Sequence, residues 1–307
     1  MRYRPFGRSG VAVSALTLRL DAQSVAGGPE GVRQLVYAAL EAGVNTFHLA
    51  ADPVLAEVVG HALSGLDRKL VCVSLGIGSA GRRGSGRDFS AEGMTAAIDQ
   101  TLSISGLDWL DLAMLEEPGA DELSQSALNA LKAQRSSGRV RLLGISGADE
   151  VMDTYVSTNA FDVMATPYHV NSPWQVKARI RAALERDMAI MAYDVFPDSL
   201  STAKKAETVH EPKKKGLFGL GGGSGRRRAD DPLAGAGTFA FLHRTAGWTA
   251  EEICVAFSLT DPAVASVIVD APTPERIEAL AEVPERDLPA GLSAQIEMAR
   301  VRAAQAA

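Results

Sequence analysis

Short apolar segments alternate with amphipathic segments along most of the chain. Eight stretches have the length and β-branched content of buried strands, namely 16–20, 46–50, 70–74, 110–115, 140–145, 162–166, 189–193 and 265–269. Between and after them, apolar residues recur every three to four positions, which predicts helices at 30–42, 55–63, 90–105, 122–136, 149–158, 176–186, 250–259, 274–282 and 293–305. Segments 2–5 and 11–14, around the turn Gly7–Gly10, predict a β-hairpin before the first of these strands.

Eight strands that each precede a helix favour a closed (β/α)8 TIM barrel over an open doubly wound sheet. No Gly-x-Gly-x-x-Gly motif follows the first strand, so nothing indicates a Rossmann-type nucleotide site. We therefore expect one barrel domain over residues 1–307, with its chemistry at the C-terminal ends of the strands.

Composition narrows the functional classes. A net charge of −6 over 307 residues gives no reason to expect nucleic acid as a partner. Cys72 and Cys254 stand in apolar segments, which predicts two buried reduced thiols. No stretch predicts a signal peptide or a transmembrane segment, so a cytoplasmic protein is expected.

Seven blocks of the sequence resemble the aldo-keto reductase family. In chain order they are YRPFGRSGVAVSAL, ALEAGVNTFHLA, LDWLDLAML, SSGRVRLLGIS, FDVMATPYHV, AIMAYD and ASVIVDAPTPERIEAL. The resemblance implies a (β/α)8 barrel that reduces carbonyls with NADPH. It also implies a catalytic tetrad in which a Tyr donates the proton, Lys and Asp tune that Tyr, and a His orients the substrate.

The positions that match this tetrad carry other residues. His48, Pro53, Leu75 and Glu116 stand where the resemblance implies Asp, Tyr, Lys and His. Proline has no acidic proton, and a positioned general acid typically contributes about 10²–10⁴-fold to a rate. The family's mechanism is therefore not expected here.

The cofactor positions are only partly kept. Ser146, Tyr193 and Arg276 match positions at which the family holds the carboxamide, the nicotinamide ring and the 2′-phosphate. Other matching positions have lost their polar or small residues, as in Arg19, Gly147, Ala165, Asp270 and Leu280. These losses favour a protein without a cofactor, and retained NADP binding is the alternative.

Arg19, His48 and Glu116 are expected to project together into the barrel mouth. One hypothesis is a new acid–base or ligand-binding cluster in which Glu116 orients His48. The plainer alternative is an Arg19–Glu116 ion pair that closes a degenerate pocket beside His48. A metal site of His48, Asp52 and Glu116 has no short ligand motif to support it.

A long segment, 201–237, follows the seventh predicted barrel strand. It contains two basic clusters around a glycine-rich stretch with apolar residues, formed by Lys213, Lys214, Lys215, Leu217, Phe218, Leu220, Arg226, Arg227 and Arg228. This composition is typical of a flexible loop. The alternative is a docking loop for an acidic protein partner or an anionic surface.

Two functions follow from the sequence. The first is an aldo-keto-reductase-like protein that has lost oxidoreductase activity and acts as a binding, scaffolding or regulatory protein. The second is a divergent NADP-dependent oxidoreductase with a rebuilt active site.

Overall fold

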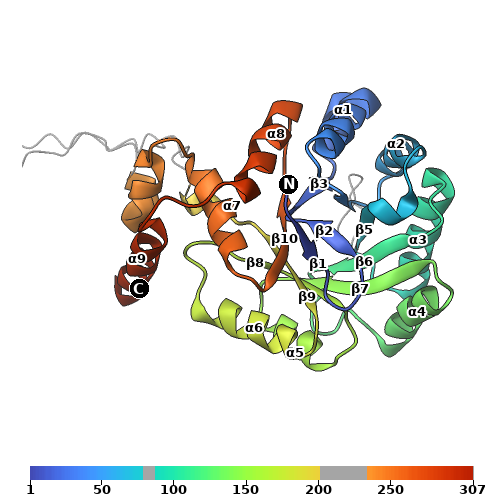
Figure 1. Cartoon of the computed structure of the whole chain (residues 1–307). Helices are drawn as coiled ribbons and strands as arrows, with labels where there is room; N and C mark the ends of the chain where they lie inside the picture. The colour runs from blue at the N-terminus through green and yellow to red at the C-terminus, as the bar shows by residue number, and fades with distance from the viewer. Residues whose placement is uncertain (79–86, 201–233, 307) are drawn as a thin grey trace, which may run out of the picture.

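The computed structural model describes residues 1–78, 87–200 and 234–306, and its centre is a closed barrel of parallel strands (Figure 1). The strands are β3 (Leu16–Leu20), β4 (Thr46–Leu49), β5 (Cys72–Ile77), β6 (Leu110–Glu116), β7 (Val140–Ser146), β8 (Val163–Pro167), β9 (Ala189–Tyr193) and β10 (Val264–Val269). They pair in chain order, and β10 closes the barrel against β3. A hairpin of β1 (Tyr3–Pro5) and β2 (Ala12–Ser14) precedes them. The predicted (β/α)8 barrel with an N-terminal hairpin is confirmed.

Helices surround the barrel in the described part of the chain. They are α1 (Gly28–Glu41), α2 (Pro53–Leu63), α3 (Ala91–Ser105), α4 (Gln125–Ser136), α5 (Val151–Ser157), α6 (Trp174–Leu184), α7 (Ala250–Thr260), α8 (Pro274–Glu282) and α9 (Leu292–Ala306). Short 3-10 segments are η1 (Ser24–Gly27), η2 (Arg68–Leu70), η3 (Asp198–Leu200), η4 (Ala234–Arg244) and η5 (Val283–Glu285). None of the described helices is long and apolar enough to cross a membrane.

Side-chain caps explain where two helices begin. The Asp52 carboxylate accepts a hydrogen bond from the Val54 amide at 2.8 Å, so α2 begins at Pro53, two residues before the predicted start. The Ser124 hydroxyl accepts from the Ala127 amide at 3.1 Å, so α4 begins at Gln125 rather than at residue 122.

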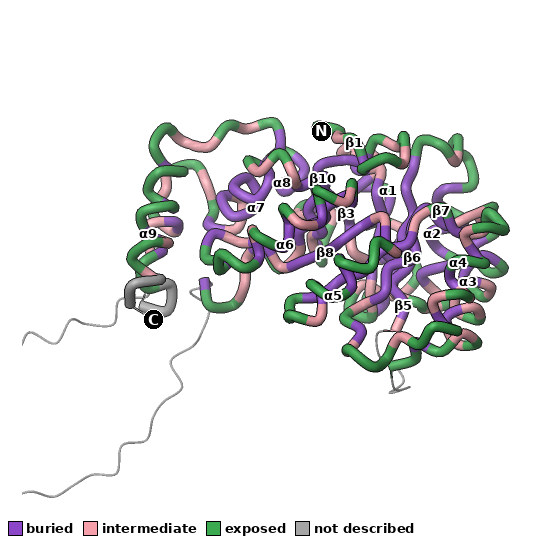
Figure 2. Tube along the Cα trace, turned by 90° about the horizontal axis from the view of Figure 1, so that it is seen from below, coloured by how far each residue is buried: buried purple, intermediate pink, exposed green. Residues whose placement is uncertain are grey.

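Two apolar layers fill the space inside and outside the barrel wall. Alternate residues of each strand point to opposite faces of a sheet. One cluster, which includes Leu112, Met114 and Met191, fills the interior together with Phe6 from the hairpin. A larger cluster lies between the strands and the helices. Figure 2 shows buried residues along the barrel strands and exposed residues on the outer turns of the helices.

The segment after β9 departs in part from the prediction. The expected loop 201–237 is too long, because Ala234–Arg244 forms η4. Phe239 and Leu242 of η4 are buried in a separate cluster with residues of α7 and α9. The predicted docking residues 213–228 lie outside the residues that the structure describes.

Candidate functional site

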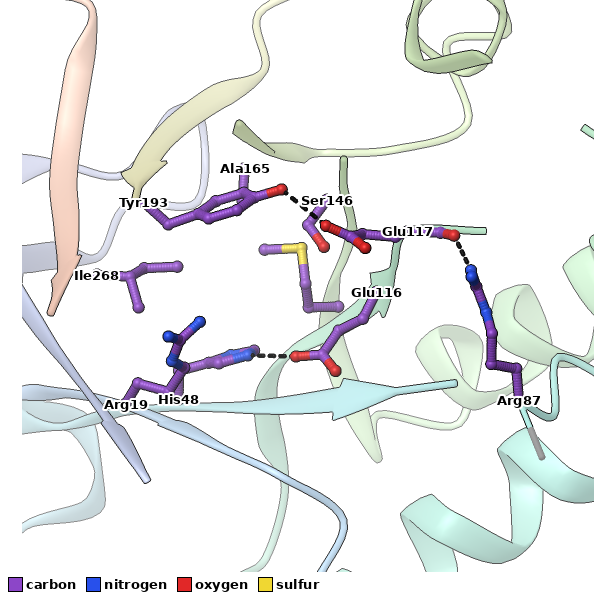
Figure 3. A pocket seen from close by; sticks show the side chains of 10 residues that line it. Arg19, His48, Arg87, Glu116, Glu117, Ser146, Ala165, Tyr193 and Ile268 are labelled. Carbon is purple, nitrogen blue, oxygen red and sulfur yellow. Dashed lines mark hydrogen bonds and ion pairs between the residues drawn. The ribbon is translucent and has the colours of Figure 1, made fainter. Parts of the chain in front are cut away.

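A cavity of about 350 Å³ opens at the C-terminal ends of the barrel strands. Its lining comes from nearly every side of the barrel, as Figure 3 shows, and comprises Arg19, His48, Arg87, Met114, Glu116, Glu117, Ser146, Ala165, Tyr193 and Ile268. A cavity of this size accommodates a small ligand, and its position is where barrel enzymes carry their chemistry.

His48 on β4 and Glu116 at the end of β6 face each other across β5 at the mouth. His48 Nε2 lies 2.9 Å from Glu116 Oε1, and His48 Nδ1 lies 2.9 Å from Ser74 Oγ. His48 and Ser74 are buried, whereas Glu116 is partly exposed to the cavity. The predicted contact between Glu116 and His48 is therefore present, and Ser74 is a third member that the sequence did not reveal.

Gly76 makes room for the Glu116 carboxylate. A Cβ atom at position 76 would lie 2.5 Å from Glu116 Oε1, which is closer than real Cβ contacts. Gly76 is on β5, directly beside Met114 of β6 in the register of the two strands. The carboxylate thus occupies space that almost any side chain at position 76 would take.

The expected ion pair between Arg19 and Glu116 is corrected by the structure. Arg19 instead binds Asp270 with two hydrogen bonds, of which Nε to Oδ1 is 2.6 Å. Burial opposes the charge of Arg19, but the hydrogen bonds and charge of Asp270 outweigh that effect and raise the arginine pKa. Because β10 lies next to β3, this pair joins the last strand of the barrel to the first.

Glu117 is a site residue that the sequence analysis missed. It follows β6 with a φ of 52°, a left-handed conformation that is uncommon for glutamate and often marks a functional site. Its carboxylate accepts a hydrogen bond from the Tyr193 hydroxyl at 3.3 Å, and its carbonyl accepts one from Arg87 (Figure 3). Two consecutive glutamates at the end of a predicted strand, Glu116 and Glu117, could have indicated this second site residue in the sequence.

The two remaining tetrad positions lie away from the cavity lining. Pro53 is exposed at the first turn of α2. Leu75 packs outward in the cluster between strands and helices. The alternation along β5 instead turns Ser74 and Gly76 inward, with Ser74 contacting His48.

The three retained cofactor positions are not equivalent. Ser146 and Tyr193 line the cavity, whereas Arg276 on α8 pairs with Glu251. Burial lowers the pKa of Arg276. Burial, followed by the charge and hydrogen bond of Glu117, raises the pKa of Tyr193, so its hydroxyl keeps its proton and serves as a hydrogen-bond donor rather than as an acid.

Among the described residues, few groups would support a nicotinamide adenine dinucleotide phosphate. A second cavity, which shares Arg19 with the mouth, is lined by Asp270, whose charge is paired with Arg19, and by Glu275, whose charge would repel phosphates. The cation retained for the 2′-phosphate, Arg276, is already bound by Glu251. Ala165 adds no polar group to the lining of the mouth.

The described residues contain no group of three His, Cys, Asp or Glu side chains that could hold a metal ion. Asp52, one of the considered ligands, uses its carboxylate to cap α2. Both cysteines are buried and free in the structure.

Comparisons with known proteins give consistent results. The sequence profile described as "Aldo/keto reductase family" matches residues 19–300. The chain is 26% identical to D-threo-aldose 1-dehydrogenase of Pseudomonas sp over 220 residues, which cover 70% of this chain and 64% of that protein. It is 26% identical to 6-dehydroglucose reductase of Novosphingobium aromaticivorans over 204 residues, covering 61% and 65%.

A third relative, L-galactose dehydrogenase of Arabidopsis thaliana, is 27% identical over 163 residues, or 50% of each chain. The matched regions thus span less than two thirds of each of these curated relatives. Among solved structures, a Bacillus halodurans aldo-keto reductase in its holo form superposes with a TM-score of 0.76. It has 19% identity, with 97% of this chain and 96% of that chain covered.

Proposed function

Because the chain belongs to the aldo/keto reductase family, we propose that it uses the family's barrel mouth to bind a small hydroxyl-rich molecule and has lost carbonyl reduction by the family mechanism. The observation that carries this proposal is the Glu116 carboxylate, held by His48 over Gly76. The hydrogen-bonded pair of buried His48 and partly exposed Glu116 occupies the mouth, and the pKa of the Tyr193 phenol is raised.

Charge supports an uncharged ligand over a nucleotide. Arg19 is bound by Asp270, and Arg87 by the Glu117 carbonyl and by Glu122. An anionic phosphate would therefore have to compete for cations that are already engaged.

Hydroxyl groups suit the lining better. The carboxylates of Glu116 and Glu117 accept hydrogen bonds from hydroxyls, and the Tyr193 ring offers an apolar surface for a sugar face. The three relatives are named for sugars or sugar derivatives, which agrees with this ligand class.

A turnover assay tests the proposed loss of reduction. NADPH and NADH oxidation is followed with glyceraldehyde and with sugar aldehydes as substrates, in parallel with an active aldo-keto reductase. We expect no carbonyl-dependent oxidation above the protein-free rate. Carbonyl-dependent oxidation of either nucleotide that scales with protein concentration would contradict the proposal.

A divergent NADP-dependent oxidoreductase is the second candidate. It is favoured by Ser146 and Tyr193, which remain at the mouth in the positions expected for a nicotinamide. This candidate predicts that Tyr193→Ala weakens NADPH binding at least about tenfold, whereas Glu57→Gln on the exposed face of α2 leaves it unchanged.

A further inference from the structure

Three polar side chains form a line from the barrel interior to the mouth. Ser74 is at the inner end, His48 is in the middle and Glu116 is at the cavity. The side chain of His48 is 5% exposed and that of Glu116 is 24% exposed. A ligand in the cavity therefore meets the carboxylate, with the imidazole behind it.

The contacts of His48 with Ser74 and Glu116 satisfy both ring nitrogens in either protonation state of His48. In the neutral ring, Nε2–H donates to Glu116 while the Ser74 hydroxyl donates to Nδ1. In the imidazolium, both ring nitrogens donate, and the Ser74 oxygen becomes the acceptor. When the imidazolium passes its Nε2 proton to Glu116, Nδ1–H still donates to Ser74 and Nε2 accepts from the new carboxyl hydroxyl, so no buried ring nitrogen is left unpaired.

The line is built by residues from three neighbouring strands. β4 supplies His48, β5 supplies Ser74 and Gly76, and β6 supplies Glu116. In register, Ser74 is directly beside His48. Gly76 clears the space for the carboxylate, so four positions serve a single arrangement. An inert, collapsed pocket would need none of these matches.

Two hydroxyl donors line the same cavity. Ser146 donates to the Leu115 carbonyl and Tyr193 donates to Glu117, both at 3.3 Å, which is long for hydroxyl hydrogen bonds. A ligand oxygen that carries developing negative charge would compete well for either donor.

We infer that Glu116 is a general base for proton transfer next to a carbonyl in a hydroxy aldehyde or ketone, with His48 as its positioning residue. This inference rests on the proposed ligand class. Glu116 takes the proton from the carbon beside the carbonyl, and the C–H electron pair forms a carbon–carbon double bond. The carbonyl π pair moves to oxygen, which Ser146 and Tyr193 stabilise.

The reaction is completed without a redox cofactor. The hydroxyl proton on the neighbouring carbon passes to the former carbonyl oxygen, and a new carbonyl forms at that neighbouring carbon. Glu116 returns its proton to the former carbonyl carbon. One carbon is reduced while its neighbour is oxidised, so an aldose and its ketose interconvert with atoms and electrons balanced.

Hydrogen exchange in D₂O tests this step. The full chain is incubated without nucleotide with glyceraldehyde, D-glucose or L-galactose, and proton NMR follows loss of the C2–H signal and appearance of the ketose. Binding of each sugar is measured on the same sample by calorimetry. We expect exchange with at least one sugar that binds.

Three variants make the result specific. Glu116→Gln is expected to slow exchange at least about 100-fold, whereas Glu57→Gln on the exposed face of α2 leaves the rate unchanged. His48→Gln is expected to lower kcat and to alter the pH profile with little change in KM, which a purely structural role would not do. Thermal melting verifies that each variant is folded.

Three outcomes overturn the inference. One is a sugar that binds without exchange, which leaves the proposed binding function intact. Another is an unchanged rate in folded Glu116→Gln. The third is a panel in which no sugar binds, which removes the ligand class as well. Carbonyl-dependent NADPH oxidation would instead contradict the proposed loss of reduction and is measured separately.

Discussion

The unusual residues at the barrel mouth fit one another. The carboxylate at position 116 fits because position 76 has no side chain, and it is held because position 48 carries an imidazole. Asp270 likewise binds the large guanidinium of Arg19. Each unusual residue therefore has a partner that accommodates it.

Replacing Gly76 by alanine tests this dependence. The new Cβ would displace the carboxylate at the end of the flexible Glu116 side chain, so the expected cost is the lost hydrogen bond to His48, typically about 0.5–1.5 kcal/mol of unfolding free energy. Gly65→Ala is the control, because a Cβ there meets no atom within 4 Å. Urea denaturation should show a lower unfolding free energy for Gly76→Ala and an unchanged one for Gly65→Ala. Equal stability of the two variants would contradict the tight packing described here.

The sequence predicted some of these contacts and missed others for clear reasons. His48 lies on β4 and Glu116 at the end of β6, with only β5 between them, so strand order alone placed both side chains on the same side of the mouth. The partner of Arg19 is 251 residues away and becomes adjacent only when β10 closes on β3. The outward direction of Leu75 did not follow from the sequence, because a shift of one residue along a strand reverses the face that a side chain takes.

At the scale of elements, Asp111 joins the N-terminal ends of two strands. Its buried carboxylate accepts hydrogen bonds from Arg68 at 2.6 Å, the Val73 amide at 2.8 Å and Trp109 Nε1 at 3.0 Å. The guanidinium of Arg141 lies 3.8 Å from the Trp109 ring centroid. This network ties η2 and β5 to β6 at the end of the barrel opposite the cavity.

Asp111→Ala should be strongly destabilising. It leaves the charge of Arg68 without its buried partner, and breaking such a pair typically costs about 3–5 kcal/mol. Asp108→Ala, at an exposed position of the preceding turn, should stay within about 0.5 kcal/mol of the parent. Denaturant midpoints at neutral pH measure both changes, and a small effect at Asp111 would refute its structural role.

The elements were predictable to different degrees. Strand and helix positions followed from apolar spacing, whereas helix starts depended on caps such as Asp52 and Ser124. The 3-10 segment η4 escaped prediction because it begins with the run Ala234–Gly237, whose two glycines are typical of a loop and which ends in a non-helical kink at Gly237. Its buried Phe239 contributes to packing that depends on α9, which is far along the chain.

For the whole molecule, the barrel shape is the best-supported feature. The superposition with a solved aldo-keto reductase covers nearly the entire chain at 19% identity. Core-forming positions tolerate apolar exchange, whereas catalysis depends on particular side chains. Sequence patterns therefore predicted the fold more fully than the site.

The basic segment makes a separate prediction at this scale. Deleting residues 213–228 removes six basic side chains, each of which contributes about 1 kcal/mol near anionic lipid. We expect the full chain to co-sediment with phosphatidylserine vesicles at low salt and to lose this binding at high salt. The deletion variant should not sediment, although its thermal midpoint stays unchanged. Equal sedimentation of both proteins would show that the segment does not mediate binding to the vesicles.

The central claim is that the mouth binds a hydroxyl-rich ligand around Glu116 instead of a nicotinamide nucleotide. Calorimetric titration of one preparation with L-galactose, D-glucose, glyceraldehyde and NADPH tests it most directly, with Glu116→Ala alongside. The account predicts saturable heat with at least one sugar and loss of that heat in the variant. It predicts no binding heat with NADPH up to about 1 mM, a concentration that would detect a binding free energy of about −4 kcal/mol. Saturable NADPH binding without any response to the sugars would contradict it.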